Sequence, residues 1–251
     1  MSRVNYKLIS NKEAVPVFKS NIFSKHKDKQ FVAIPLGFGV YPKGCDKNLF
    51  LNYLRLRKNV YVNQTGMLDE DVVLSDNTEV DDDDHRSFHM VVAENQGDGS
   101  VAIIACQRLI TKQDGKQLPI EAFFPEAFYH TQHSEYSIEV SRYISRAKKG
   151  YGYNFQVLSI MAKMMMNYVS QHNIKHIYGV IEEDLEKAFK KAKLPFKRIA
   201  EPKIVEEYND YNLGIEINIK KYNFLLNLFA LPKIKDIFID ENQQIFWGQY
   251  K

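Results

Sequence analysis

The chain has 251 residues, 45% of them hydrophobic, and its 34 Lys and Arg against 31 Asp and Glu give a formal net charge of +3. A disordered chain would have fewer apolar residues and more net charge, and two cysteines are too few for a disulfide scaffold. No apolar run approaches the ~20 residues that span a bilayer, and the N-terminus lacks the apolar segment of a secretory signal. These properties predict a soluble, cytoplasmic protein with one large domain or two small ones.

The predicted elements follow from hydrophobic periodicity and from turn residues along the chain. Short apolar or alternating runs predict strands at 31–40, 87–93, 100–110, 136–144, 174–181, 196–200 and 213–219. Apolar residues at three- and four-residue steps predict helices at 48–62, 153–172, 182–193 and 220–230. The acidic stretch 69–84 is expected to be a loop, and 95–99 a hairpin turn. Strands first and strand–helix units afterwards predict a mixed α/β sheet, part of it parallel.

Several common site motifs are missing from the sequence. The two cysteines lack the paired spacing of metal ligands. The histidine pairs His85/His89 and His172/His176 have four-residue spacing, but neither pair falls within one predicted helix, so no metal site is predicted. The sequence contains no phosphate-binding loop, no Ser nucleophile elbow and no visible nucleic-acid-binding motif.

Two charged residues, Glu139 and Arg142, interrupt the apolar stretch predicted as a strand at 136–144. On a regular strand Glu139 and Ser141 point to one face, and Val140 and Arg142 to the other. Charged residues are rarely buried unless they are paired or functional. The stretch is therefore either an edge strand with both charges in solvent or part of a site.

Two further features allow more than one interpretation. The acidic stretch 78–86 is either a solvated loop or a carboxylate cluster that recognises an amine. The basic turn 146–152 precedes the long helix, and its glycines Gly150 and Gly152 leave backbone N–H groups free to bind an anion. An ordinary basic surface turn explains the same residues.

The order of short motifs between residues 51 and 200 resembles the acyl-homoserine-lactone synthase group. The likeness is closer to its relatives, the N-acyl amino acid synthases and the exosortase-linked acyltransferases. Each motif is short, and their joint order carries the resemblance. The motifs are Leu56-Arg-Lys-Asn-Val-Tyr61, Met67, Glu79-Val-Asp81, Arg86, Gln107-Arg-Leu109, Leu118-Pro-Ile-Glu121, Phe124 and Ile138-Glu-Val-Ser-Arg142.

The resemblance implies a GNAT-type fold, in which a central mixed β-sheet is splayed into a V with helices on both faces. It implies transfer of a fatty acyl group from a pantetheine thioester, on acyl carrier protein or coenzyme A, to an amine, with no permanently bound cofactor. Carried over by position, it implies catalytic Glu139 and Arg142 and the acceptor-side residues Arg57, Tyr61, Glu79, Asp81, Arg108 and Phe124.

The sequence departs from the lactone-synthase pattern on the acceptor side. Tyr61 stands where Phe is usual, Met67 where Trp is usual, and Thr78 where Asp is general. These departures favour an amino acid or a related amine as acceptor over S-adenosylmethionine. The leading hypothesis is therefore an N-acyl amino acid-type product. The alternatives are a true acyl-homoserine-lactone synthase and, in another class, a non-catalytic GNAT-fold module that binds an acyl carrier or a partner.

The expected chemistry needs a base and charged groups from the protein rather than a nucleophilic side chain. Glu139 is expected to remove the proton of the amine, and Glu79 and Asp81 to hold the acceptor's ammonium. Arg108 or Arg142 would bind an acceptor carboxylate. The donor side is expected to comprise Arg146, Lys148 and Lys149 for an acidic carrier and Gly150 and Gly152 for pantetheine.

Two remaining expectations concern the apolar helix and the domain limits. Met161, Met164, Met165 and Met166 either line an acyl tunnel or belong to the ordinary core. The expected organisation is an N-terminal extension packed on the domain (1–45), a GNAT-like acyltransferase domain (46–222) and a C-terminal extension (223–251).

Overall fold

The computed structural model describes residues 17–19, 31–96, 100–113, 115–129, 136–145, 151–191 and 193–222. Of residues 17–19, 151–155, 188 and 191, it describes the backbone alone. Residues 146–150 of the turn predicted at 146–152 lie outside the described residues, as do the C-terminal extension 223–251 and most of the helix predicted at 220–230. Among the described helices, none is long and apolar enough to cross a membrane.

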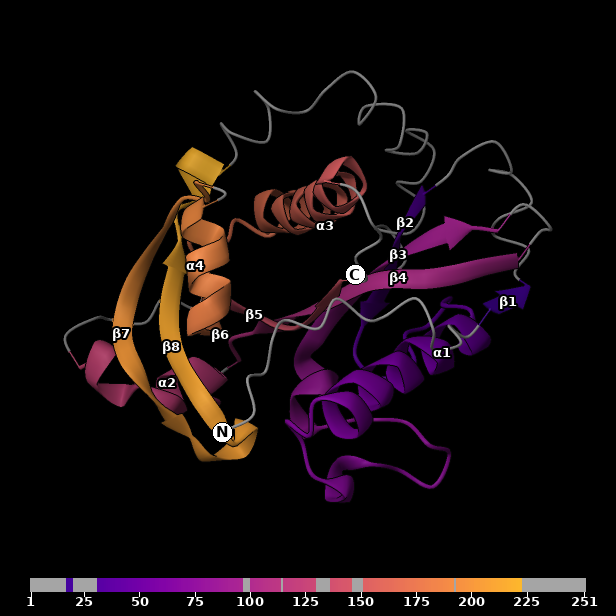
Figure 1. Cartoon of the computed structure of the whole chain (residues 1–251), viewed down its shortest axis with the longest axis horizontal. Helices are drawn as coiled ribbons and strands as arrows, with labels where there is room; N and C mark the ends of the chain where they lie inside the picture. Colours follow the sequence, from indigo (N-terminus) through magenta and orange to yellow (C-terminus); the bar gives the residue numbers. More distant parts are fainter. Residues whose placement is uncertain are drawn as a thin grey trace.

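A single mixed sheet organises the described part of the chain (Figure 1). Its strands run in the order β2-β3-β4-β5-β6-β8-β7, and β1 pairs with β4. The strands are β1 Val17–Lys19, β2 Phe31–Phe38, β3 Ser87–Asn95, β4 Ser100–Thr111, β5 Ser137–Ser145, β6 His176–Glu182, β7 Phe196–Val205 and β8 Asp210–Ile217. The pair β5 and β6 is parallel, and the other pairs are antiparallel. The mixed sheet predicted from the element order is therefore confirmed.

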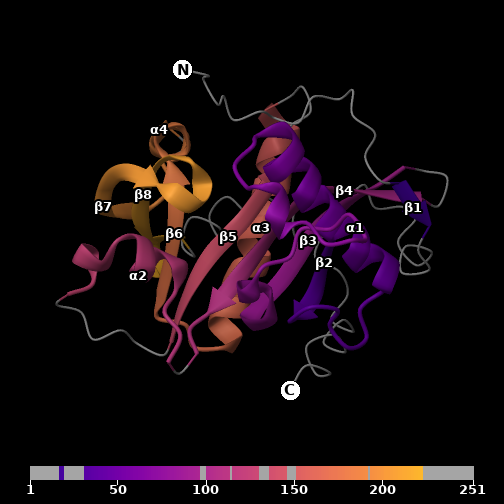
Figure 2. The same ribbon diagram turned by 90° about the horizontal axis from the view of Figure 1, so that it is seen from below.

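Among the described residues, four α-helices of five residues or more cover the two faces of this sheet. They are α1 Lys47–Lys58, α2 Pro119–Phe123, α3 Tyr151–Gln171 and α4 Glu183–Lys191. α1 and α2 lie on one face, which is the nearer one in Figure 2, and α3 and α4 lie on the other. Short 3-10 turns at Glu70–Val72, Asp82–Arg86, Pro125–Ala127 and Glu206–Tyr208 complete the fold.

α1 is amphipathic, and its ends follow from its sequence. The Asp46 side chain accepts hydrogen bonds from the backbone N–H groups of Asn48 and Leu49 at 2.8 and 3.1 Å, which caps the first turn. The helix predicted at 48–62 is wrong in its last turn, because residues Asn59–Gln64 form a π-helix. Thr65 closes this wider turn through its N–H, which donates to the Val60 carbonyl at 3.0 Å.

β2 forms an edge of the sheet, and its sequence contains one proline, Pro35, and one glycine, Gly37. The register with β3 shifts between Pro35 and Gly37, so a β-bulge accommodates the proline that the sequence places inside the strand. Phe31, Val32 and Leu36 are nevertheless buried in the core. Residues 31–38, which precede the predicted domain limit at 46, thus belong to the same sheet.

Candidate active site

The sheet opens between β5 and β6, and this opening holds the site. The two strands pair from Ser137↔His176 only to Val140↔Gly179, after which β5 continues to Ser145 and β6 to Glu182. A cavity of about 230 Å³ lies in the gap, lined by both strands, α3, α4 and β8. The splayed V expected from the resemblance is therefore present.

β5 is a central strand with a β-bulge, which corrects two expectations. It lies between β4 and β6, so the interpretation as an edge strand is wrong. The register with β4 shifts between Cys106 and Arg108, and Arg142 adopts a left-handed φ of 51°. The strict alternation that sent Glu139 and Arg142 to opposite faces is therefore also wrong, since the bulge brings both to the face of α1 and α2.

Glu139 is buried, with 1% of its surface exposed, and it lines the cavity at the point where β5 and β6 separate. Its Oε2 accepts a hydrogen bond of 2.8 Å from the backbone N–H of Ile120, in the first turn of α2. Burial raises the pKa of Glu139 to about 8, while the Ile120 hydrogen bond opposes the rise. A carboxyl with this pKa can exchange a proton with an amine near neutral pH.

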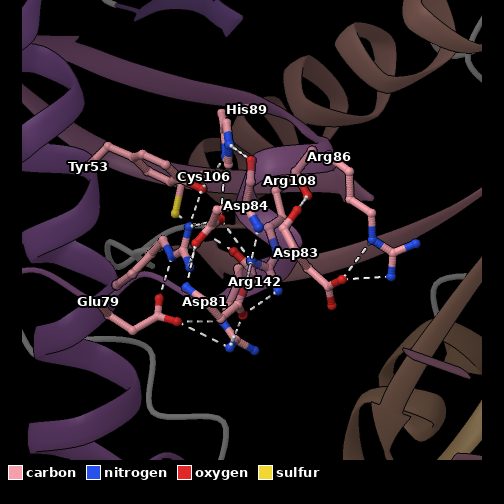
Figure 3. A network of polar contacts seen from close by, with 12 residues as sticks. Tyr53, Glu79, Asp81, Asp83, Asp84, Arg86, His89, Cys106, Arg108 and Arg142 are labelled. Atoms are coloured by element: carbon pink, nitrogen blue, oxygen red, sulfur yellow. Dashed lines mark hydrogen bonds and ion pairs between the residues drawn. The ribbon is translucent and has the colours of Figure 1, made fainter. Parts of the chain in front are cut away.

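Beside Glu139, three arginines and three carboxylates form a buried ionic network (Figure 3). Arg57 from α1 binds Asp84 through two hydrogen bonds of 2.7 and 2.9 Å and also pairs with Glu79. Arg108 from β4 binds both oxygens of Asp81 and reaches Asp84 at 2.7 Å. Three positive and three negative charges thus neutralise one another inside the protein, as buried charges require.

Arg142 connects this network to the cavity. Its Nη2 lies 3.1 Å from Glu79 Oε1 and 2.8 Å from Asp81 Oδ2. Arg142 also lines the cavity, where its guanidinium carbon lies 5.4 Å from the centre of the Tyr61 ring. The Tyr61 hydroxyl donates to the Tyr143 carbonyl at 3.0 Å, which fixes the ring under the guanidinium.

The carboxylates of the network are ionised despite their burial. Burial by itself would raise the pKa of Asp84, but Arg57 and Arg108 outweigh it and hold the pKa well below its usual range. Burial is likewise outweighed at Glu79 by Arg57 and Arg142, and at Asp81 by Arg108, so the pKa of each is lowered. Oxygens of the three carboxylates approach within 4.8 Å, but guanidinium groups occupy each carboxylate, so the arrangement is a salt-bridge network rather than an open cation site.

A second layer of contacts holds the network in place. His89 lies between the Tyr53 hydroxyl, 3.0 Å from Nδ1, and the Asp84 carbonyl, 3.3 Å from Nε2. Burial lowers the pKa of His89 to about 4, so the ring is neutral at pH 7. The Asp81 and Asp84 side chains each accept the other's backbone N–H, at 3.2 and 2.9 Å, which closes the turn that carries both.

The predicted site residues differ in how close they lie to the cavity. Tyr61, Glu139 and Arg142 line the cavity. Arg57, Glu79, Asp81 and Arg108 lie in the network next to it, where the Asp81 side chain is 21% exposed and the other three are at most 2% exposed. Phe124 is buried against β6 and β7 and does not line the cavity. Arg146, Lys148, Lys149 and Gly150 lie outside the described residues, and Gly152 is described as backbone in the first turn of α3.

Sequence reasoning missed some residues of the site. Asp84 binds two arginines, and the stretch 78–86 flagged it only as one of several acidic residues. Tyr208 and Glu182 line the cavity from the arm formed by β6, β7 and β8. Burial, with help from Asp210 and Asp184, raises the pKa of Glu182 to about 7. No sequence signal connects these residues to Glu139, because only the fold brings them together.

The methionines of α3 are all buried in the hydrophobic core, and two of them also line the cavity. Met161 and Met165, four residues apart and so on one face of the helix, line the cavity. Met164 and Met166 pack in the core without contacting it. All four methionines thus belong to the hydrophobic core, and two of them also line the cavity, so the acyl-tunnel interpretation stays a prediction for Met161 and Met165 alone. The cavity combines this flexible apolar wall with the carboxyls of Glu139 and Glu182 and the guanidinium of Arg142, an arrangement suited to an apolar chain with a polar end.

Comparison with known proteins identifies both the sequence family and the fold. A family model described as autoinducer synthase matches residues 45–223. The AHL synthase LasI has a similar structure, with a TM-score of 0.58, 19% identity and coverage of 75% of this chain and 90% of LasI. BjaI, a CoA-dependent acyl-homoserine lactone synthase, has a TM-score of 0.58, 18% identity and coverage of 81% and 90%.

A third similar structure belongs to another reaction class. FeeM, an N-acyl amino acid synthase from uncultured soil microbes, has a TM-score of 0.55 and 12% identity, with coverage of 80% of this chain and 98% of FeeM. At these identities the structural likeness shows the GNAT-like fold alone. A search of the curated proteins finds no match.

Proposed function

Because this chain belongs to the autoinducer synthase family of acyltransferases, we propose that it moves a fatty acyl group from a pantetheine thioester to the amine of an amino acid or a related small acceptor. The observation that carries the proposal is the pair Glu139 and Arg142. One buried carboxyl and one guanidinium meet a largely apolar cavity at the point where β5 and β6 part.

Glu139 is the proposed base. An α-amino group has a pKa near ~8 and must lose a proton before it attacks a thioester. Burial raises the pKa of Glu139 to about 8, close to the pKa of the amine, so the proton can pass from the amine to the carboxylate. The oxyanion of the tetrahedral intermediate would accept a hydrogen bond from a backbone N–H of β5 beyond Val140, where pairing with β6 has ended. Such a donor typically lowers a barrier by about 3–4 kcal/mol.

Arg142 is the proposed partner for an acceptor carboxylate. It lines the cavity, whereas Arg108 is bound to Asp81 and Asp84 and does not. Of the two arginines expected for this role, the geometry favours Arg142. Asp81, whose side chain is 21% exposed, is the more accessible of the two carboxylates expected to hold the acceptor's ammonium, because Glu79 is fully buried.

The donor would occupy the gap with its acyl chain along Met161 and Met165. Gly150 and Gly152 are proposed to meet the phosphate of the pantetheine arm, and Arg146, Lys148 and Lys149 to dock an acidic carrier protein. Acyl carrier protein is the proposed donor, and BjaI, described as CoA-dependent, supports acyl coenzyme A as the alternative.

A second candidate function is acyl-homoserine-lactone synthesis from S-adenosylmethionine. The family's description and the similarity to LasI favour it. Tyr61 and Met67 line the cavity, so the departures from the lactone-synthase pattern at these positions bear directly on the acceptor side and favour an amino acid.

Product analysis tests the proposal directly. The purified protein is offered acyl carrier protein or coenzyme A thioesters, with either a mixture of amino acids or S-adenosylmethionine, and the products are identified by mass spectrometry. We expect an N-acyl amino acid. An acyl-homoserine lactone without any N-acyl amino acid would instead establish the second candidate. If Glu139→Gln and the wild type release free thiol equally slowly with every acceptor, the protein is a non-catalytic module.

A further inference from the structure

The short helix α2 contacts the proposed base. Its residue Ile120 donates a backbone N–H to Glu139 Oε2 at 2.8 Å. This hydrogen bond joins α2 to the middle of β5 across 19 residues of sequence. Because α2 has only five residues, its own helical hydrogen bonds are too few to hold it in position. Other contacts must therefore fix the N–H group that points at Glu139.

Glu121 supplies these contacts through both of its oxygens. Oε2 accepts the backbone N–H of Leu118 at 2.8 Å, which closes the first turn of α2. Oε1 lies 2.5 Å from Lys112 Nζ, at the end of β4, and the Glu121 side chain is 3% exposed. The backbone N–H of Lys112 donates in turn to the Ser137 carbonyl at 3.2 Å. Ser137 precedes Glu139 by two residues on β5.

These contacts form a closed ring around the base. From Glu139 the ring passes through Ile120 to Glu121, on to Lys112, and back to β5 at Ser137. The sheet fixes α2 from another side, because β8 carries glycine where α2 packs. A Cβ atom at Gly214 would lie 3.3 Å from the Ile120 side chain and 3.1 Å from Ala200. The absence of that Cβ lets α2 pack closely against β8.

We propose that Glu121 and Lys112 are positioning residues for the acyl transfer, which hold the Ile120 N–H against Glu139 and thereby favour the ionised, proton-accepting form of the base. The inference rests on the proposed function, in which Glu139 takes the proton of the amine. Neither Glu121 nor Lys112 lines the cavity, so both would act through Ile120.

The electrostatic surroundings of Glu139 show why this N–H matters. Burial disfavours the carboxylate, and the Ile120 hydrogen bond is the largest contribution that favours it. The charged groups facing Glu139 are Asp83 and Arg86 from the 3-10 turn and Arg108 from β4, and their effects are smaller and of both signs. The Tyr208 hydroxyl faces it from the turn between β7 and β8. Loss of the N–H would therefore make Glu139 harder to ionise.

The test compares Glu121→Ala, Glu121→Gln and Lys112→Met with the control Glu126→Gln. Glu126 is an exposed carboxylate in the adjoining turn and pairs with Lys203 at 3.4 Å. The kcat/KM for thiol release is measured between pH 6 and pH 10. Glu121→Ala should lose about three- to tenfold at pH 7, because the Ile120 hydrogen bond to Glu139 is weakened by about the worth of one ordinary hydrogen bond, and it should approach the wild type at high pH. Glu121→Gln retains an acceptor for Leu118 and should lose less, and Glu126→Gln should match the wild type.

A second measurement does not depend on catalysis. The change in the free energy of unfolding caused by Glu139→Gln is measured against pH in the wild type and in the Glu121→Ala and Lys112→Met backgrounds. The limiting pH, above which this change no longer increases, should be higher in the two variant backgrounds than in the wild type. A loss of activity that is equal at every pH, or an unchanged limiting pH in the folded Glu121→Ala and Lys112→Met backgrounds, overturns the inference. If the limit moves but Glu139→Gln remains fully active, the positioning stands and the proposed function fails.

Discussion

At the scale of single residues, the clearest feature is a carboxyl group that the fold makes harder to ionise. The fold buries Glu139 and gives it a backbone N–H but no direct cationic partner among the described residues. Its pKa is raised to about 8, chiefly by burial. A group with a raised pKa stabilises the folded state below its unfolded pKa, and this contribution is lost as the pH rises to the folded pKa. The free energy of unfolding therefore depends on pH through this residue.

Glu139→Gln should therefore stabilise the protein at high pH. The variant keeps an acceptor for Ile120 but no longer ionises. Relative to the wild type, its free energy of unfolding should rise from about pH 4.5 to about pH 8 by about 5 kcal/mol and then level off. Urea unfolding at a series of pH values measures the difference, with Glu126→Gln as the exposed control. A difference that does not vary with pH would show that Glu139 titrates normally.

The buried ionic network gives a prediction with the opposite pH dependence. Arg57→Met leaves Glu79 and Asp84 without one of their cations and should cost about 3–5 kcal/mol at pH 7. The two carboxyls have lowered pKa values in the wild type, so their stabilisation exists above about pH 4 and disappears as the pH falls. The cost of the substitution should accordingly shrink in acid.

Denaturant unfolding at pH 7 and at pH 3 measures this cost. The control is Arg55→Met, two residues earlier on the exposed side of the same helix, which should change stability by no more than about 0.5 kcal/mol. Equal effects of the two substitutions at pH 7 would contradict the assigned role of the network.

Among the site residues, sequence reasoning identified most of the charged groups but not their arrangement. Glu79, Asp81, Arg108 and Arg142 were expected to contact an acceptor, whereas the structure binds most of their polar atoms to one another. The sequence shows which residue types are present. Which of these side chains form hydrogen bonds with one another depends on which ones the folded sheet brings within about 3 Å. Asp84 shows the limit of prediction from sequence. It is fully buried between two arginines, but the acidic residues next to it in the sequence indicate an exposed loop.

At the scale of secondary-structure elements, periodicity predicted most of the strands and failed where the backbone is irregular. The strands at 87–93, 100–110 and 136–144 appear as β3, β4 and β5 with slightly different ends. The π-helix after α1 and the bulge in β5 were missed, because a single residue in an unusual conformation leaves no periodic signal. The bulge also explains why Glu139 and Arg142, three residues apart on a strand, share a face.

α3 offers a prediction about the acyl chain. Met161 lines the cavity and Met164 does not, although both are buried on the same helix. Met161→Phe should shift donor preference toward shorter acyl chains by reducing the space in the cavity. Met164→Phe should instead cost about 1–3 kcal/mol of stability by overpacking, without changing the preference. Relative kcat/KM values with short-, medium- and long-chain donors distinguish the two variants. An unchanged preference in Met161→Phe would show that the acyl chain does not bind along this part of the cavity.

At the scale of the whole molecule, the small net charge hides an uneven distribution. Residues 69–84 contain nine acidic residues and no Lys or Arg, while residues 142–198 contain twelve Lys and Arg against four Asp and Glu. The fold changes the meaning of the acidic part, because Glu79, Asp81 and Asp84 are neutralised by buried arginines. Part of the positive charge in the second half is paired as well, because Arg142 binds Glu79 and Asp81, and Glu186 binds Lys190 and Arg198.

This charge distribution predicts how salt affects the binding of the acyl donor. If the basic turn docks an acidic carrier, the KM for acyl carrier protein should rise at least about threefold as the ionic strength increases from low salt to about 0.5 M, where screening limits attraction to a few ångströms. The KM for acyl coenzyme A should change less. The combined change Arg146→Ala, Lys148→Ala and Lys149→Ala should raise the carrier KM at low salt and reduce its salt dependence, whereas Lys116→Ala should not. A carrier KM independent of both would place the docking surface elsewhere.

The short pairing of β5 with β6 has a consequence for how the protein unfolds. Four residue pairs join the half of the sheet with β2 to β5 to the half with β6, β8 and β7, so the sheet is least continuous at this boundary. The smaller half should therefore open at a lower free energy than global unfolding. In amide hydrogen exchange, residues 176–217 should exchange together and sooner than the buried amides of β3 and β4. A bound donor that fills the gap should slow this exchange, which would make the boundary a direct physical reporter of substrate binding.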